Sequence, residues 1–121
     1  PANWKDEKAK NEFEIRANNI NSDANYEYFP LYKGSAFYPR GARVRGIEGY
    51  CTTEYTVTKS GGVADIFVPD CGPVDGRGEC RFRDACIDVA KRTYRYLPSQ
   101  VNGEPVDSNG VKTRVTFEKA D

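Results

Sequence analysis

The stretch YPRGARVRGIEG at residues 38–49 decides how the middle of this chain folds. Pro39 suits the first position of a helix, where its missing N–H costs no hydrogen bond, and Gly46 suits the left-handed residue that ends one. The side chains then alternate, and one face of the expected strand is formed by Cys51, Thr53, Tyr55 and Val57. These features predict a short helical turn that leads directly into a half-buried strand.

A β-hairpin is expected after this stretch. The tetrapeptide KSGG at residues 59–62 is typical of a hairpin turn, and residues 63–68 are predicted to form the returning strand. A polar, glycine-rich loop is expected from residue 69 to residue 78. The sequence thus predicts two antiparallel strands joined by a tight turn and followed by a loop.

A helix and a closing strand complete the pattern. Apolar residues recur at helical spacing between residues 82 and 90, with charged residues between them. Pro98 ends this helical region, because proline disfavours helical geometry at the residue before it. After turn-forming residues at 102–106, alternation returns from Val111 to Glu118. A third strand is therefore expected near the end of the chain.

These elements predict an α+β fold in the form of a two-layer sandwich. A three-stranded antiparallel sheet carries one main helix, residues 80–92, packed across one face. A short helix follows the tyrosine–proline pair, and an N-terminal helix capped by Asn3 precedes the domain. Residues 1–30 are expected to form this N-terminal helical extension or linker, and residues 31–121 the main domain.

The same pieces in the same order resemble the TonB C-terminal domain family over residues 31–119. Members carry a YP-x-x-A and a G-x-E-G element before an alternating strand, as residues 38–49 do here. Their helix ends in an aromatic-basic-aromatic-x-Pro element, matched by residues 94–98. An N-G-x-P-V turn, matched by residues 102–106, precedes the closing strand. One departure is Tyr94, which stands where members usually carry tryptophan.

The resemblance implies a periplasmic domain that binds the TonB box, a short peptide of an outer-membrane transporter, by strand addition. Such a domain transmits proton-motive-force energy for the uptake of nutrients such as iron chelates. It receives that energy from the ExbB/ExbD complex through an N-terminal anchor in the inner membrane of a Gram-negative cell, and it needs no cofactor. The residues that match partner-binding positions are Tyr38, Pro39, Arg40, Val111, Lys112, Thr113, Arg114, Val115, Thr116 and Phe117.

A second function stays open from the same residues. A soluble periplasmic relative of the TonB or TolA type would share the fold but engage a different envelope partner, and an N-terminal membrane helix would distinguish the two. The given sequence holds no apolar run long enough for such a helix and no cleavable signal pattern. An exposed strand edge would also permit a homodimer formed by strand exchange.

The four cysteines are an even set, without a CxxC pair, in a chain that has no histidine. Disulfides are the favoured state and indicate an oxidising compartment, whereas a four-thiolate zinc site and buried free thiols are the alternatives. Of the three possible pairings, we favour Cys71–Cys80, which flanks the glycine-rich loop, together with Cys51–Cys86 across the core. A bridge between Cys51 and Cys71, brought together by the hairpin, is the rival.

Catalysis is not expected. Without histidine the chain has no Ser/His/Asp or Cys/His catalytic group, and it has no phosphate-binding glycine loop or metal-loop spacing. Asp84 and Asp88 lie one helical turn apart among arginines, which indicates a surface ion network. The formal net charge of +0 gives no general attraction to nucleic acid. Arginines 40, 43 and 45 form either a solvated face or a basic surface for an acidic partner.

Overall fold

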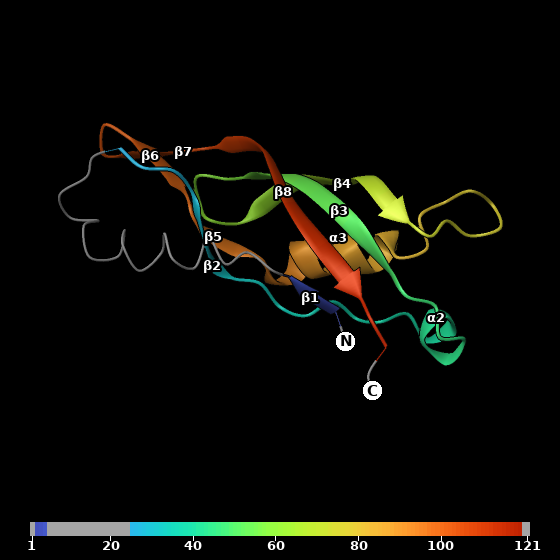
Figure 1. The fold of residues 1–121 in the computed structure, drawn as a ribbon. Helices are drawn as coiled ribbons and strands as arrows, with labels where there is room; N and C mark the ends of the chain where they lie inside the picture. The colour runs from blue at the N-terminus through green and yellow to red at the C-terminus, as the bar shows by residue number, and fades with distance from the viewer. Residues whose placement is uncertain (1, 5–24, 120–121) are drawn as a thin grey trace.

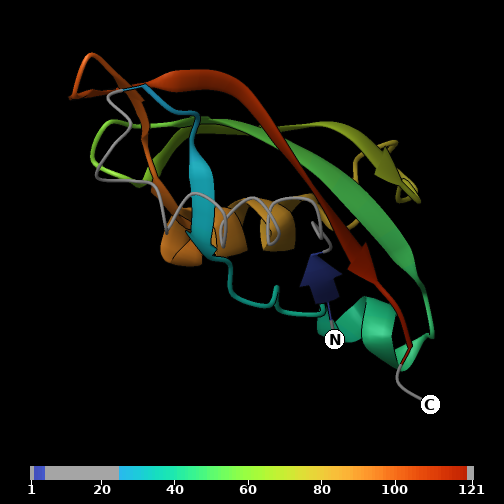
Figure 2. The same ribbon diagram turned by 60° about the vertical axis from the view of Figure 1, so that its left-hand side comes forward.

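An antiparallel sheet with a helix across one face forms the body of the molecule (Figure 1). The computed structural model describes residues 2–4 and 25–119. The sheet runs in the order β1 (Ala2–Trp4), β8 (Ser108–Phe117), β3 (Gly49–Val57) and β4 (Val63–Gly72). The helix α3 (Arg83–Thr93) packs against β3 and β4 (Figure 2). The predicted α+β architecture, an antiparallel sheet covered by one main helix, is confirmed.

The N-terminus differs from the sequence prediction. Asn3, the predicted cap of an N-terminal helix, lies instead in the strand β1 and pairs with Thr116 of β8. The main sheet consequently has four strands rather than the predicted three. The rest of the predicted helix falls in residues 5–24, outside the described residues. A free sheet edge favours such an addition because it presents a row of backbone N–H and C=O groups to any extended segment.

Two small two-stranded sheets extend this body. They pair β2 (Phe29–Tyr32) with β5 (Arg95–Leu97), and β6 (Ser99–Val101) with β7 (Glu104–Val106). The helical region ends before β5, because Tyr94 is already extended with a φ of −69° and a ψ of 127°. Asn102 and Gly103 both have positive φ, 51° and 81°, which is the geometry of a type I′ hairpin turn. The predicted turn at residues 102–106 is therefore a whole small hairpin.

The elements around the opening stretch follow the prediction with one change of length. The short helix α2 (Arg40–Val44) begins directly after Pro39 and is followed by Gly46 with a φ of 68°. β4 continues to Gly72, whereas the predicted strand ends at residue 68. Its proline and glycine content is typical of a loop, but the neighbouring β3 offers pairing partners as far as Tyr50, opposite Gly72. Tertiary pairing thus overrides the local turn preference there.

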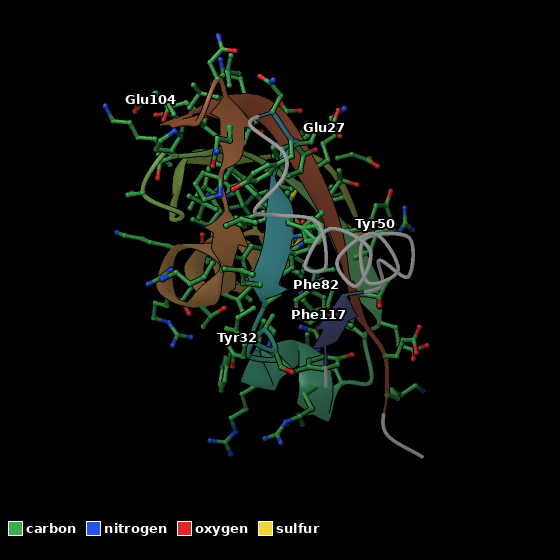
Figure 3. The ribbon with its side chains drawn as sticks, turned by 90° about the vertical axis from the view of Figure 1, so that its left-hand side faces the viewer. Glu27, Tyr32, Tyr50, Phe82, Glu104 and Phe117 are labelled. Atoms are coloured by element: carbon green, nitrogen blue, oxygen red, sulfur yellow. A yellow bond between two sulfur atoms is a disulfide. The ribbon has the colours of Figure 1, made fainter. Side chains whose placement is uncertain are left out.

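The core lies between the sheet and α3, and the predicted alternation of β3 and β8 is confirmed by burial. The buried residues of the two strands are Cys51, Thr53, Tyr55, Val57, Val111, Thr113, Val115 and Phe117. Phe82 stacks on Phe117, with their ring centroids 4.2 Å apart (Figure 3). From the helix, Cys86, Val89 and Ala90 are buried against the same layer.

Two disulfides connect the helix segment to the sheet. Cys51–Cys86 joins β3 to α3, and both residues are fully buried. Cys71–Cys80 joins the end of β4 to the segment before α3. These are the pairings that we favoured from the sequence. The rival pairing is wrong although Cys51 and Cys71 are opposite each other on β3 and β4, because each sulfur bonds a residue of the helical segment instead.

The loop that the Cys71–Cys80 bridge closes is organised by one carboxylate. Asp75 Oδ1 accepts hydrogen bonds from the backbone N–H groups of Arg77, at 2.8 Å, and Glu79, at 3.1 Å. These two bonds hold the pKa of Asp75 below its usual value. A lowered folded-state pKa means that the stabilisation is present above the unfolded value of about 3.9 and is lost as the pH falls through the folded value.

We expect the backbone amide signals of Arg77 and Glu79 to titrate with Asp75 in the acid range. Asp75→Asn should abolish this titration while keeping the two bonds, because its side-chain oxygen still accepts but carries no charge. Asp75→Ala should abolish the titration and also speed hydrogen exchange of both amides at neutral pH. NMR titration and exchange of the three proteins check this, and equal exchange in wild type and Asp75→Ala would contradict it.

Candidate functional site

The sheet has two outer strands, and β4 is a poor template for a further strand. Pro69 lacks a backbone N–H, and Asp65 has a positive φ of 53°. The pairing of β4 with β3 shifts register twice, between Thr52 and Glu54 and between Glu54 and Thr56. Proline and bulges protect an edge strand from pairing because they remove donors and bend the backbone. An incoming strand would therefore meet an irregular edge along β4.

The edge formed by β8 is regular. Residues 111–117 of β8 face residues 49–55 of β3 one to one, with no shift in register. β1 pairs with the last part of this run, at residues 115–117, on the side away from β3. In the part of the chain that the structure describes, no strand lies on that side of residues 111–114. β8 thus presents a regular run of backbone groups at residues 111–114.

The side chains of β8 divide the predicted partner-binding residues into two groups. One group has side chains buried in the core: Val111, Thr113, Val115 and Phe117. On the outer face, the Lys112 ammonium lies 3.7 Å from the Glu54 carboxylate. The Arg114 guanidinium stacks over the Tyr50 ring, 3.9 Å from its centroid. Both exposed cations therefore already have partners on β3.

A buried polar network fixes the inner face of β8. The Lys33 ammonium donates a hydrogen bond to Thr113 Oγ1 at 2.6 Å, and the Tyr55 hydroxyl lies 2.5 Å from the same oxygen. The Tyr55 and Tyr96 hydroxyls are also hydrogen-bonded, at 2.5 Å. Lys33 Nζ lies 5.3 Å from the ring centroid of Tyr94, within the range of a cation–π interaction. Burial, reinforced by Tyr96, raises the pKa of Tyr55, so this hydroxyl stays protonated.

Sequence reasoning missed this network because its central residue carries no local signal of burial. Lysine is rarely buried unless it is paired, and Lys33 stands in an irregular segment before α2. The sequence did contain one sign of it, a polar residue at a core-facing position of the alternating pattern in each of two strands. These residues are Thr53 and Thr113, and the structure places them opposite each other on β3 and β8.

The residues that match the tyrosine–proline motif gather at the C-terminal end of β8. The Tyr38 ring packs edge-to-face on Phe117, with 5.5 Å between centroids, and its hydroxyl donates to the Ile47 carbonyl at 2.5 Å. Tyr38 is only 8% exposed, and burial raises its pKa. Pro39 is half-buried at the start of α2, and Arg40 is exposed. Tyr38 therefore supports the end of β8 from within, and Arg40 is the accessible member of the three.

Chemistry of other kinds finds no support among the described residues. Residues 2–4 and 25–119 contain no group of three or more potential metal-ligating side chains. No helix among them has the length and hydropathy of a membrane span. On α3, Arg92 Nη2 lies 2.7 Å from the Asp88 carboxylate, and this bond lowers the pKa of Asp88. The exposed Asp88–Arg92 pair is the kind of surface ion interaction that the sequence predicts.

Comparisons with known proteins agree with this architecture. The family described as Gram-negative bacterial TonB protein C-terminal matches residues 35–118. The solved structure of the TonB2 protein from Vibrio anguillarum is 30% identical over 83% of this chain and 87% of that chain, with a TM-score of 0.54. The solution NMR structure of the Pseudomonas aeruginosa TonB CTD is 26% identical over 78% of this chain and 88% of that chain, with a TM-score of 0.52. Comparison with curated protein sequences gives no significant match.

The matched segment contains α2, β3, β4, α3 and the whole of β8. Lys33 and the strand β1 lie outside it. The family predicted from the sequence is therefore confirmed over the elements that carry the site. The chain belongs to the TonB C-terminal domain family, the non-enzymatic periplasmic domains of Gram-negative energy transducers that act on outer-membrane transporters.

Proposed function

We propose that this domain binds the TonB box of an outer-membrane transporter by adding it as a strand to the edge of β8. The observation that carries the proposal is the contrast between β8, which is open beside residues 111–114 in the described part of the chain, and the outer strand β4. β8 keeps an unbroken register with β3 over residues 111–117, whereas β4 is interrupted by two register shifts and a proline. Strand addition needs a regular row of backbone donors and acceptors, and β8 has one.

The backbone supplies most of the affinity in this mode of binding. Main-chain hydrogen bonds hold the added peptide, and side chains adjust specificity. Lys112 and Arg114 are already engaged with Glu54 and Tyr50, so they modulate binding rather than anchor it. A contact that transmits force must also be released, and a backbone-dominated edge with few side-chain anchors suits a weak to moderate affinity.

Family membership also supports a wider role. In the full-length protein, the domain is tethered to the inner membrane by an N-terminal anchor and works with the ExbB/ExbD complex. The bound transporter then receives work derived from the proton gradient and takes up a nutrient such as an iron chelate. Membership of the TonB C-terminal domain family supports this role.

Hydrogen exchange with a synthetic TonB-box peptide tests the site. Backbone N–H groups of successive strand residues point to opposite sides. A peptide added to β8 should therefore slow exchange at every second amide of residues 111–114, which no strand of the described residues covers on that side, and leave the intervening amides, already bonded to β3, almost unchanged. Titration of the wild-type protein by NMR, followed by exchange of the saturated complex, measures this period of two.

Two single substitutions serve as controls. Lys112→Ala and Arg114→Ala should each lower the affinity for the peptide by no more than about threefold, because they leave the backbone intact. Thr113→Pro is unsuitable as a test, since Thr113 belongs to the buried network and its loss disturbs the fold. Protection or shift changes confined to α3, with none in β8, would rule out strand addition and favour a soluble relative with another partner.

A further inference from the structure

The strand β1 lies on the edge of β8 that the proposed function uses. Ala2, Asn3 and Trp4 pair antiparallel with Phe117, Thr116 and Val115. Figures 1 and 2 both show β1 alongside the last part of β8, on the side away from β3. β1 comes from the opposite end of the chain and lies outside residues 35–118, which match the family. This contact is therefore a feature that the family match does not account for.

We propose that β1 is an intramolecular occupant of the recruiting edge, which a transporter peptide must displace. The proposal rests on the proposed function, because it concerns the same backbone groups of β8. A peptide that pairs along residues 111–117 overlaps with β1 at residues 115–117. Two strands cannot pair with the same residues on the same side of β8, so binding along the full run and β1 pairing exclude each other.

The relative lengths of the two strands favour replacement. β1 makes three residue pairs with β8, whereas a peptide along residues 111–117 covers these and the four residues before them. Residues 111–114 are open on that side within the described residues, so a peptide can begin to pair there before β1 leaves. β1 has the advantage of being part of the same chain, which gives it an effective concentration in the millimolar range. Short peptides that reach only residues 115–117 are therefore excluded, and longer ones bind.

Two proline substitutions in the full chain separate the pairing of β1 from other effects. Because neighbouring N–H groups of a strand point to opposite sides, one of Ala2→Pro and Asn3→Pro removes a donor to β8. The other removes a donor that points away and is the matched control. If the edge is free for about a tenth to a third of the time in wild type, release of β1 should raise the affinity for the synthetic TonB-box peptide about three- to tenfold. The control variant should bind like wild type.

Two readouts follow β1 directly. Without peptide, the releasing variant should show faster hydrogen exchange at residues 115–117 than the wild type, with the β3–β4 pairing unchanged. Trp4 is the sole tryptophan of the chain, so tryptophan emission reports on β1. In wild type, saturating peptide should shift this emission toward that of a synthetic peptide of residues 1–10, which serves as the released reference.

The outcomes distinguish the two proposals. Equal peptide affinity in wild type and both proline variants, with no change of Trp4 emission on saturation, overturns the competition and leaves strand addition to β8 intact. Peptide protection of residues 111–114 with the Trp4 emission unchanged also overturns it, because β1 then stays on residues 115–117. Failure of every variant to bind the peptide overturns strand addition itself and the competition with it.

Discussion

Replacing Cys51 and Cys86 together by alanine should lower the free energy of unfolding by about 4 kcal/mol, the largest effect that we expect from any pair of substitutions. The bridge joins residues 35 apart in sequence, and loop-closure entropy in the unfolded chain grows with that separation. Both sulfurs also lie in the core between β3 and α3, so their removal leaves a small cavity. Urea unfolding followed by circular dichroism measures the loss.

The second disulfide supplies the matched control. Cys71 and Cys80 are only 9 apart in sequence, and both are half-buried rather than fully buried. Replacing both by alanine should lower the free energy of unfolding by about 3 kcal/mol. A loss as large as that for the Cys51–Cys86 pair would contradict the argument from loop length and burial.

Thr53→Val and Thr113→Val should change stability in opposite directions although the chemical change is the same. Thr113 Oγ1 is bonded to the Lys33 ammonium and the Tyr55 hydroxyl, so its loss removes a shared partner from a buried network. We expect Thr113→Val to destabilise the fold by about 2–3 kcal/mol. Thr53 Oγ1 is buried and has no hydrogen-bond partner among the described residues, so Thr53→Val should stabilise by about 1 kcal/mol.

Thr113→Ser tests whether the hydroxyl is the cause. It keeps the oxygen and removes one methyl group, so most of the stability lost in Thr113→Val should return. Thermal and urea unfolding of the three variants, compared with wild type, provide the measurement. If Thr53→Val lowered the free energy of unfolding as much as Thr113→Val does, the buried network would not be what distinguishes the two positions.

Periodicity located the main elements because it records which face of a segment is buried. The alternation of residues 51–57 and 111–117 and the helical spacing of residues 82–90 appear as β3, β8 and α3. Each pattern is a property of neighbouring residues, so it can be recognised without knowing which element packs against the segment. The lengths were less well predicted, since β4 runs to Gly72 through proline and glycine only because β3 continues beside it.

The candidate site divides in the same way. Motif resemblance named residues 111–117 as the recruiting strand, and the regular register of β8 supports that proposal. The sequence could not show that Tyr38 is buried under the end of this strand, nor that Lys33 reaches Thr113 across the core. Both contacts join residues that are distant in sequence, and no local sequence pattern predicts such a long-range contact.

The amino-acid sequence by itself determined the family, the order of the main strands and helix, and the favoured cysteine pairing, because these follow from local spacing and residue type. Only the tertiary structure decided how regular each strand of the sheet is and which segment lies beside β8. The bulges of β4 arise from its pairing with β3, and the three residues of β1 are too few to show a periodicity. β1 reaches β8 because the edge groups of residues 115–117 accept any extended backbone, whatever its side chains.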